Sequence, residues 1–285
     1  MGFICKFFGH KWNGNSRCER CGVTVCGITD YDLLLKIALN SDSENIYLGD
    51  EEIDHVINHL KDSDMFAVAM LKRKGLCFGK SLQEEATKRV TDQAQLAAIV
   101  RNDGCCGAMW NAAERLFDQT LILNLYETAG NFTRIKLLTN LSDKDALRKI
   151  ALTDEFAAMG AVKKLVTVCR KNNDTLSLVD ALLMLLKYGA EGDSRYEKGD
   201  ETRVGKDDCV NAVSELVALS NTQPDFIRSR WNEIRGLVTN LAISYSWNRF
   251  SDEEVTIDAG SKNENYGKEL LNQFPKEFLN NSNVL

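Results

Sequence analysis

The sequence predicts an all-α fold, an α-α superhelix of about six helix pairs, and three observations carry this prediction. The chain of 285 residues has only two prolines, Pro224 and Pro275, so long stretches are free to be helical. A motif recurs along the chain with a period of about 30 residues. Within each copy of the motif, apolar residues recur at the spacing of one helix face.

Each copy of the motif begins with an aspartate and continues with an amphipathic segment. The copies begin at Asp30, Asp62, Asp92, Asp118, Asp143 and Asp174. Apolar residues stand four, seven and eight positions after each aspartate. In chain order these groups are Leu34, Ile37 and Ala38; Phe66, Ala69 and Met70; Leu96, Ile99 and Val100; Ile122, Leu125 and Tyr126; Leu147, Ile150 and Ala151; and Leu178, Ala181 and Leu182. These offsets share one helix face, so each copy is expected to open with a helix whose N-cap is the aspartate.

A second helix is expected in each copy, directly before the next aspartate. These second helices are predicted to end at Leu60, Val90, Leu116 and Leu141, with Val56, Ala86, Ala112 and Leu137 four positions earlier on the same face. Paired helices joined by tight turns are typical of an α-solenoid. Over roughly residues 29–190 the pattern resembles HEAT-like repeats in shortened form; the alternative is a single irregular helical bundle.

The repeat loosens after Tyr188. Residues 189–208 are polar and contain four glycines, which predicts a long mobile loop inside the sixth pair. Helices are expected again at about 207–220 and 225–246, then a polar stretch at 251–266, a short amphipathic piece through Leu270, Leu271, Phe274 and Phe278, and a loose tail. Three domains are therefore predicted. Residues 1–28 form an N-terminal segment, residues 29–250 form the α-helical repeat domain, and residues 251–285 form a polar linker, a short helix and a tail.

Four potential metal ligands gather near the N-terminus with the spacing C-x4-H-x7-C-x2-C. They are Cys5, His10, Cys18 and Cys21. A C-x2-C pair binds one tetrahedral ion from a tight turn, and Gly22 lets backbone amides approach the sulfurs. The pattern predicts a small zinc knuckle over residues 1–28, with a structural site because all four positions are filled by protein. Cys26 is an alternative for one ligand, and a frayed terminus with unremarkable cysteines is the alternative to the whole site.

The first 22 residues also resemble the short zinc-binding proteins of phages and prophages, which share the pattern C-K-x-F-G-H-K-W followed by C-x-x-C-G. This resemblance implies a phage or bacterial origin and no activity.

Charge and cysteine content limit which partners and which cellular compartment are expected. The formal net charge of −6 disfavours generic binding to a phosphate backbone, although residues 1–28 are locally basic. No run of about 18 apolar residues and no signal-peptide pattern is present, so neither a membrane span nor secretion is expected. Nine cysteines, an odd number scattered along the chain, suit a reducing compartment, and a cytoplasmic location is predicted.

Three further clusters allow both a functional and a structural interpretation. Arg228, Arg230, Trp231 and Arg235 form a group that suits a carboxylate-rich peptide or a phosphate; the alternative is a solvated face with Trp231 turned to the core. His55 and His59 share a helix face but lack the metalloprotease signature, and surface histidines near acids are the favoured interpretation. Cys105 and Cys106 lie in a turn without a C-x-x-C motif or a nearby base.

The expected function is that of a non-catalytic helical-repeat scaffold that binds a macromolecular partner, with protein favoured. Glycine-rich phosphate loops and dinucleotide motifs are missing, so no small-molecule cofactor and no enzyme activity are expected. A nucleic-acid-binding protein that uses its basic zinc knuckle is the first alternative. The second is a HEAT-like enzyme, a lyase or a metal-dependent hydroxylase; the repeated His-Glu pairs that the resemblance to such hydroxylases implies do not occur.

Overall fold

The described part of the chain is helical. The structure, a computed structural model, describes residues 17–19, 22–40, 48–71, 81–102, 105–191, 206–239, 241 and 264–280. Helices are the regular elements in these ranges, which contain no β-strand, so the all-α prediction is confirmed. The chain divides into two compact units, residues 1–141 (unit 1) and residues 142–285 (unit 2), a division that the sequence analysis did not predict.

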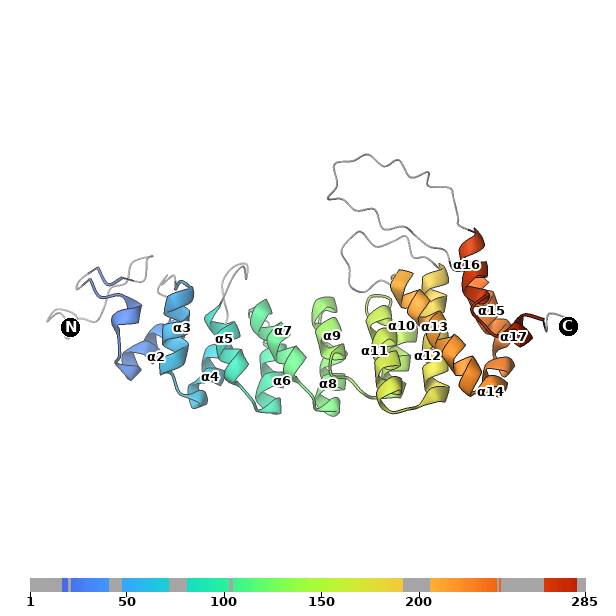
Figure 1. Ribbon diagram of the computed structural model, residues 1–285. Helices are drawn as coiled ribbons and strands as arrows, with labels where there is room; N and C mark the ends of the chain where they lie inside the picture. The colour runs from blue at the N-terminus through green and yellow to red at the C-terminus, as the bar shows by residue number, and fades with distance from the viewer. Residues whose placement is uncertain are drawn as a thin grey trace, which may run out of the picture. The chain divides into compact units, whose positions relative to one another are not determined.

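In its described residues, unit 1 contains a short 3-10 helix followed by four helix pairs (Figure 1). Its elements are η1 (Val25–Gly27), α2 (Tyr31–Asn40), α3 (Asp50–His59), α4 (Asp62–Ala69), α5 (Leu82–Arg89), α6 (Gln93–Arg101), α7 (Cys106–Arg115), α8 (Gln119–Tyr126) and α9 (Asn131–Leu138). The second helices of the pairs pack in chain order, α3 on α5, α5 on α7 and α7 on α9, while the first helices meet between α2 and α4 and between α6 and α8. The predicted order of first helix, turn and second helix is therefore present.

The aspartates that begin the copies cap their helices at five of the six predicted positions. The carboxylate of Asp92 accepts a hydrogen bond from the Gln95 amide at 2.8 Å, and that of Asp143 accepts two, from the amides of Asp145 and Ala146. The other capping aspartates are Asp30, Asp118 and Asp174. Each cap occupies an amide that the first helical turn leaves without a partner, which fixes where the helix begins.

The prediction at the second copy is wrong by one residue. The N-cap of α4 is Lys61, and Asp62 is the first helical residue, where its carboxylate accepts a hydrogen bond from Nε of Arg89 at 2.8 Å. The buried face shifts accordingly to Met65, Val68 and Ala69, while Phe66 and Met70 are only half-buried. An acidic residue in the first turn is as favourable electrostatically as one at the cap, so the sequence alone did not separate the two registers.

The predicted apolar stripe forms the core in the remaining pairs. Leu34, Leu96, Ile122 and Leu147 are at most 1% exposed. The residues predicted at the ends of the second helices are also buried, namely Leu60, Val90, Leu116 and Leu141, as are Val56, Ala86, Ala112 and Leu137 one turn earlier. Both helices of a pair thus direct one stripe inward, which is the arrangement that the period predicted.

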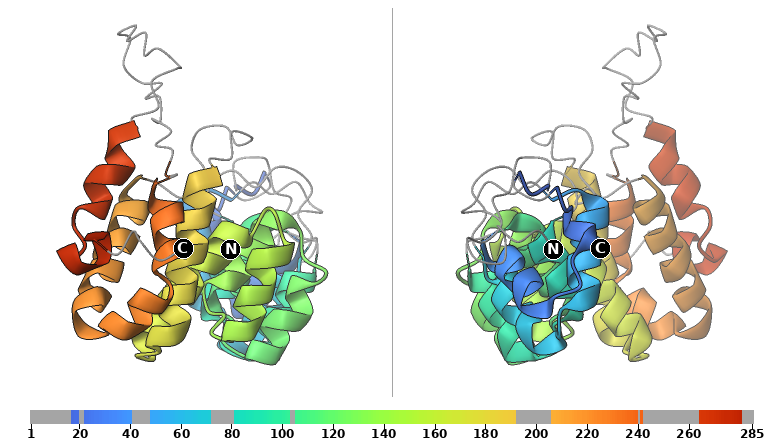
Figure 2. Two further views of the ribbon diagram at one scale, coloured as in Figure 1. Left: turned by 90° about the vertical axis from the view of Figure 1, so that its right-hand side faces the viewer. Right: turned by 90° about the vertical axis from the view of Figure 1, so that its left-hand side faces the viewer.

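In its described residues, unit 2 contains two longer helix pairs and, after them, four short helices. Its elements are α10 (Lys144–Thr153), α11 (Ala158–Lys171), α12 (Thr175–Glu191), α13 (Lys206–Thr222), α14 (Pro224–Ser229), α15 (Trp231–Thr239), α16 (Glu264–Leu271) and α17 (Lys276–Asn280). Successive helices pack from α10 to α14, and α15 packs against both α12 and α16. The two views of Figure 2 show α16, in red, beside the orange helices.

Two predictions for the C-terminal half need correction. The helix expected over 225–246 is two helices in its described part, because the chain leaves the helical path at Arg230, between α14 and α15. The predicted loop at 189–208 is shorter than expected, since α12 extends to Glu191 and α13 begins at Lys206; residues 192–205 lie outside the described ranges. The amphipathic piece is confirmed, with Leu270, Leu271, Phe274 and Phe278 all buried.

Candidate functional site

Cys18 is the one predicted zinc ligand that the structure describes, because Cys5, His10 and Cys21 lie outside the described residues. It lies at the base of a tight hairpin. The Cys18 amide donates to the Val23 carbonyl at 2.9 Å, and the Gly22 amide donates to the Cys18 carbonyl at 2.8 Å. Gly22 has φ +75°, which only glycine adopts without strain, and Cys18 is 1% exposed. Within the described residues no three Cys, His, Asp or Glu side chains gather as a metal would require.

Cys26, the alternative ligand, lies in a less suitable environment for a thiolate. Desolvation raises the pKa of the Cys26 thiol, and the carboxylates of Glu52 and Glu51 raise it further. A thiol whose pKa is raised forms the metal-binding thiolate less readily.

His55 and His59 hold the start of unit 1 together. Nε2 of His55 donates to the Ile28 carbonyl at 2.7 Å, and Nδ1 of His59 donates to the His55 carbonyl at 2.7 Å. A carbonyl only accepts hydrogen bonds, so each of these nitrogens carries its proton and is not a metal ligand in this arrangement. Val25 and Ile28 are buried, and η1 packs on α3. The described part of the N-terminal segment is therefore fastened to the first helix pair.

The predicted arginine and tryptophan group divides into buried, paired and unpaired members. Trp231 is 7% exposed and packs on Phe274 and Phe278, with ring centroids 5.0 and 5.4 Å away. Its ring therefore belongs to the core of unit 2, as the structural interpretation held. Arg228 lies over the Phe278 ring and pairs with Asp225 at 3.3 Å. Partner binding by the group as a whole stays a prediction.

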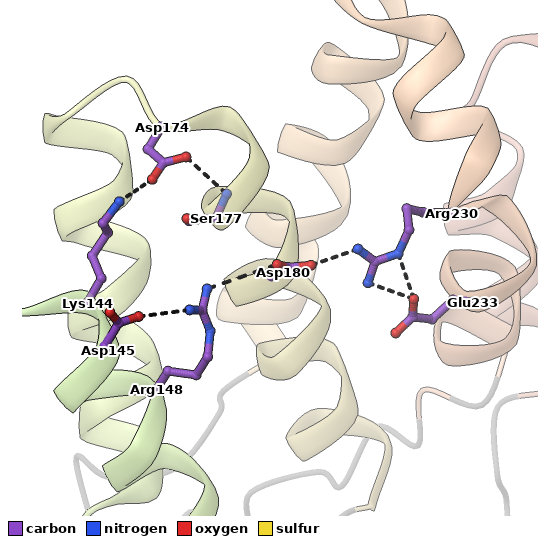
Figure 3. A network of polar contacts seen from close by, with 8 residues as sticks. All are labelled: Lys144, Asp145, Arg148, Asp174, Ser177, Asp180, Arg230 and Glu233. Atoms are coloured by element: carbon purple, nitrogen blue, oxygen red, sulfur yellow. Dashed lines mark hydrogen bonds and ion pairs between the residues drawn. The ribbon is translucent and has the colours of Figure 1, made fainter.

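Arg230 belongs to a chain of alternating charges that links three parts of unit 2 (Figure 3). Its Nη1 lies 2.7 Å from Oδ1 of Asp180 on α12, and its Nη2 lies 2.8 Å from Oε2 of Glu233. Asp180 in turn lies 4.0 Å from Arg148 on α10, which also contacts Asp145. These half-exposed pairs are individually weak, but as a network they fix α10, α12 and the α14–α15 turn in one register. The sequence analysis missed this network.

A second polar contact joins the same pair of helices. Lys144 donates to the carboxylate of Asp174, which also accepts from the Ser177 amide (Figure 3). The hydrogen bond from Lys144 is the largest cause that lowers the pKa of Asp174 to about 2, with the Ser177 bonds contributing. The same contact raises the pKa of Lys144.

The C-terminal helices enclose a shallow pocket of about 140 Å³. It is lined by Trp231, Arg235, Lys268, Leu271, Asn272 and Leu279, from α15, α16, α17 and the turn that precedes α17. Two cations, one amide and three apolar side chains thus share one concave surface. Arg235 and Trp231 belong to the group predicted from the sequence. Lys268 and Asn272 were not predicted, because they lie more than 30 residues further along the chain.

Unit 1 carries an exposed pair of aromatic rings, here called the aromatic patch, made of Trp110 on α7 and Phe132 on α9. Their ring centroids are 6.3 Å apart, and Phe132 is 67% exposed. One turn further along both helices, Glu114 and Lys136 form an ion pair at 2.6 Å. The sequence analysis missed this patch, although Trp110 stands two positions from the buried Ala112 and so falls outside the core stripe.

Cys105 and Cys106 have structural positions. Cys105 is buried at the N-cap of α7, with its sulfur 3.4 Å from Oγ of Ser81, and Cys106 is the first residue of that helix.

None of the described helices combines the length and the apolarity that crossing a bilayer requires.

Comparisons of the chain with protein-family models, with curated proteins and with solved structures find no match.

Proposed function

We propose that this protein is a non-catalytic scaffold of HEAT-like repeats, stacked as an α-α superhelix, that binds a protein partner through the aromatic patch. This proposal rests on Trp110 and Phe132, which are exposed on α7 and α9, the second helices of two neighbouring pairs. Large apolar side chains exposed side by side are unfavourable in water, and Trp is among the residues that contribute most to protein interfaces. The packed helix pairs support the repeat interpretation.

The composition of the patch and its surroundings fits a protein interface. Burying an aromatic side chain contributes roughly 1.5–3 kcal/mol, so two rings supply a substantial part of a micromolar affinity. The Glu114–Lys136 ion pair at the edge provides polar groups of both signs, which suits a polar rim around an apolar centre. A nucleic acid would require a basic surface instead, and the net charge of −6 argues against one.

The test compares proteins captured from an extract of the native host by three forms of the full chain. These are the wild type, the double variant Trp110→Ala/Phe132→Ala, and the double variant Leu152→Ala/Leu176→Ala, which removes two exposed apolar side chains from unit 2. We expect at least one protein whose recovery falls tenfold or more with the aromatic variant alone. Equal recovery of every captured protein by all three forms would contradict the proposal, and capture that disappears after nuclease treatment would favour nucleic acid.

We also propose a structural zinc ion bound by Cys5, His10, Cys18 and Cys21. The Cys18–Val23 hairpin supports it, because a buried cysteine in a turn closed by a left-handed glycine is suited to a C-x2-C pair on one ion. Elemental analysis should find one zinc per chain in the wild type and in Cys26→Ser, and none in Cys18→Ser. Full zinc content in Cys18→Ser would exclude this ligand set.

A cytoplasmic location is part of the same proposal. Cys105, Cys169 and Cys209 are buried cysteines that form no disulfide among the described residues. Burial raises the pKa of the Cys209 thiol to about 11, which keeps it protonated and unreactive. Free thiols of this kind suit a reducing compartment.

A further inference from the structure

The pocket at the end of unit 2 contains two cations whose charge the described residues leave uncompensated. Arg235 and Lys268 form no ion pair and no side-chain hydrogen bond with any described residue, and both are exposed. The other two arginines of the predicted group differ, because Arg228 and Arg230 are both paired. The pocket is therefore the place where this group retains binding capacity.

Two acidic side chains on the neighbouring helices pair with arginines outside the pocket. Glu233, on the same helix as Arg235, pairs with Arg230 at 2.8 Å. Glu277, on α17, lies 3.9 Å from Arg228. Neither acid pairs with Arg235 or Lys268, so an incoming anion would meet these two cations without displacing an internal partner.

The close packing of α16 on α15 fixes the backbone beside one of the two cations, Lys268. A Cβ atom placed on Gly267 would lie 2.6 Å from the Val238 carbonyl oxygen, so the helix backbones approach as closely as glycine allows. Lys268 follows Gly267 directly and is anchored by this contact. The pocket is therefore held by packed backbone, although its cationic side chains are exposed.

The lining favours one kind of anion. Leu271 and the Trp231 ring supply an apolar wall, and the Asn272 amide supplies a neutral hydrogen-bond donor beside the cations. A carboxylate next to an apolar side chain matches both features within about 140 Å³. A polyanionic backbone matches poorly, because the lining offers no cation beyond Arg235 and Lys268 for its neighbouring phosphates.

We propose that this pocket binds a carboxylate side chain of an acidic peptide segment in which an apolar residue neighbours the Glu or Asp. Arg235 and Lys268 bind the carboxylate, and the Trp231 wall receives the apolar side chain. This inference goes beyond the aromatic patch, since it concerns different residues in unit 2, and it shares with the proposed function only that the ligand is protein.

The test measures fluorescence anisotropy of labelled probes with the full chain. The probes are a peptide of alternating Glu and Leu, the same peptide with Gln for Glu, and a single-stranded oligothymidylate. We expect the Glu peptide to bind at least tenfold more tightly than the Gln peptide and the oligothymidylate. Arg235→Ala and Lys268→Ala should each weaken its binding about tenfold, since each removes a charge-assisted contact.

Two controls make the outcome specific. Lys149→Ala removes an exposed cation on α10 that does not line the pocket, and it should leave the affinity unchanged. Trp110→Ala/Phe132→Ala should also leave it unchanged, so that failure of the aromatic patch and failure of the pocket are separable. Equal binding of the Gln peptide, tighter binding of the oligothymidylate, or an affinity that the two pocket variants do not alter would overturn the proposal.

Discussion

Replacing Gly267 by alanine should loosen the C-terminal helices, although alanine is the better helix former. The added Cβ would lie 2.6 Å from the Val238 carbonyl oxygen, 3.0 Å from that of Thr239, and 3.1 Å from the Thr239 Cα. These neighbours are backbone atoms, which cannot rotate away, so α16 must shift off α15. Forcing extra atoms into a packed contact costs about 1–3 kcal/mol.

The intrinsic preference of the two residues acts in the opposite direction. Alanine in a helix is more favourable than glycine by up to about 1 kcal/mol. The net expectation for Gly267→Ala is a destabilisation of up to about 2 kcal/mol, obtained from the overpacking cost less the helix preference. Gly236 provides the matched control, because it lies inside α15 and a Cβ there meets no atom within 4 Å. Gly236→Ala should stabilise the same region by about 0.5–1 kcal/mol.

The assay is hydrogen exchange followed by mass spectrometry over residues 264–280, compared with peptides from α10 and α11. Gly267→Ala should speed exchange of α16 and α17 and leave α10 and α11 unchanged, whereas Gly236→Ala should slow exchange in α15 or leave it unaltered. Slower exchange of α16 in Gly267→Ala would refute the reasoning, because it would show that helix preference outweighs the backbone contact.

Three further predictions concern the repeats. Asp143→Ala should lower the free energy of unfolding in urea by about 1 kcal/mol, since it removes a cap that serves two amides; an unchanged midpoint would count against the capping role. Asp174 has its pKa lowered to about 2 by Lys144, so its stabilisation is fully present above about pH 4 and declines as the pH falls towards 2. The stability difference between wild type and Asp174→Asn should therefore shrink over that range, and a constant difference would refute the assignment. Leu147→Ala should cost about 2–5 kcal/mol because the side chain is fully buried, whereas Leu152→Ala, which is 71% exposed, should change stability by less than about 0.5 kcal/mol; similar losses in both would contradict the predicted face.

Much of the fold was predictable because it depends on short-range periodicity. The offsets of four, seven and eight residues from each aspartate identified the buried face in five copies, since a helix repeats its face within two turns. The miss at Asp62 was a register error of one residue, caused by an acidic first turn that resembles a cap. The break at Arg230 had no such signal, because it is stabilised by Asp180, which lies 50 residues earlier.

The candidate sites were less predictable, since they combine residues from distant helices. Arg235 was in the predicted group. Lys268 and Asn272 line the same pocket, but they lie in α16 and in the turn that follows it, more than 30 residues further along the chain. The charge network through Arg148 and Asp180 is of the same kind. One sequence feature indicated the aromatic patch, namely that Trp110 lies outside the core stripe. The contact of Phe132 with Trp110 was not predictable, because it depends on the packing of α9 on α7.

The central claim is that the aromatic patch is a protein-binding surface, and photo-crosslinking tests it most directly. A photoreactive phenylalanine analogue is placed at Phe132, and in a second form of the chain at Leu176, which is comparably exposed in unit 2. Irradiation in the native host should yield a discrete protein adduct from position 132 and no such adduct from position 176. Equal adducts from both positions, or adducts at position 132 that consist only of nucleic acid, would contradict the claim.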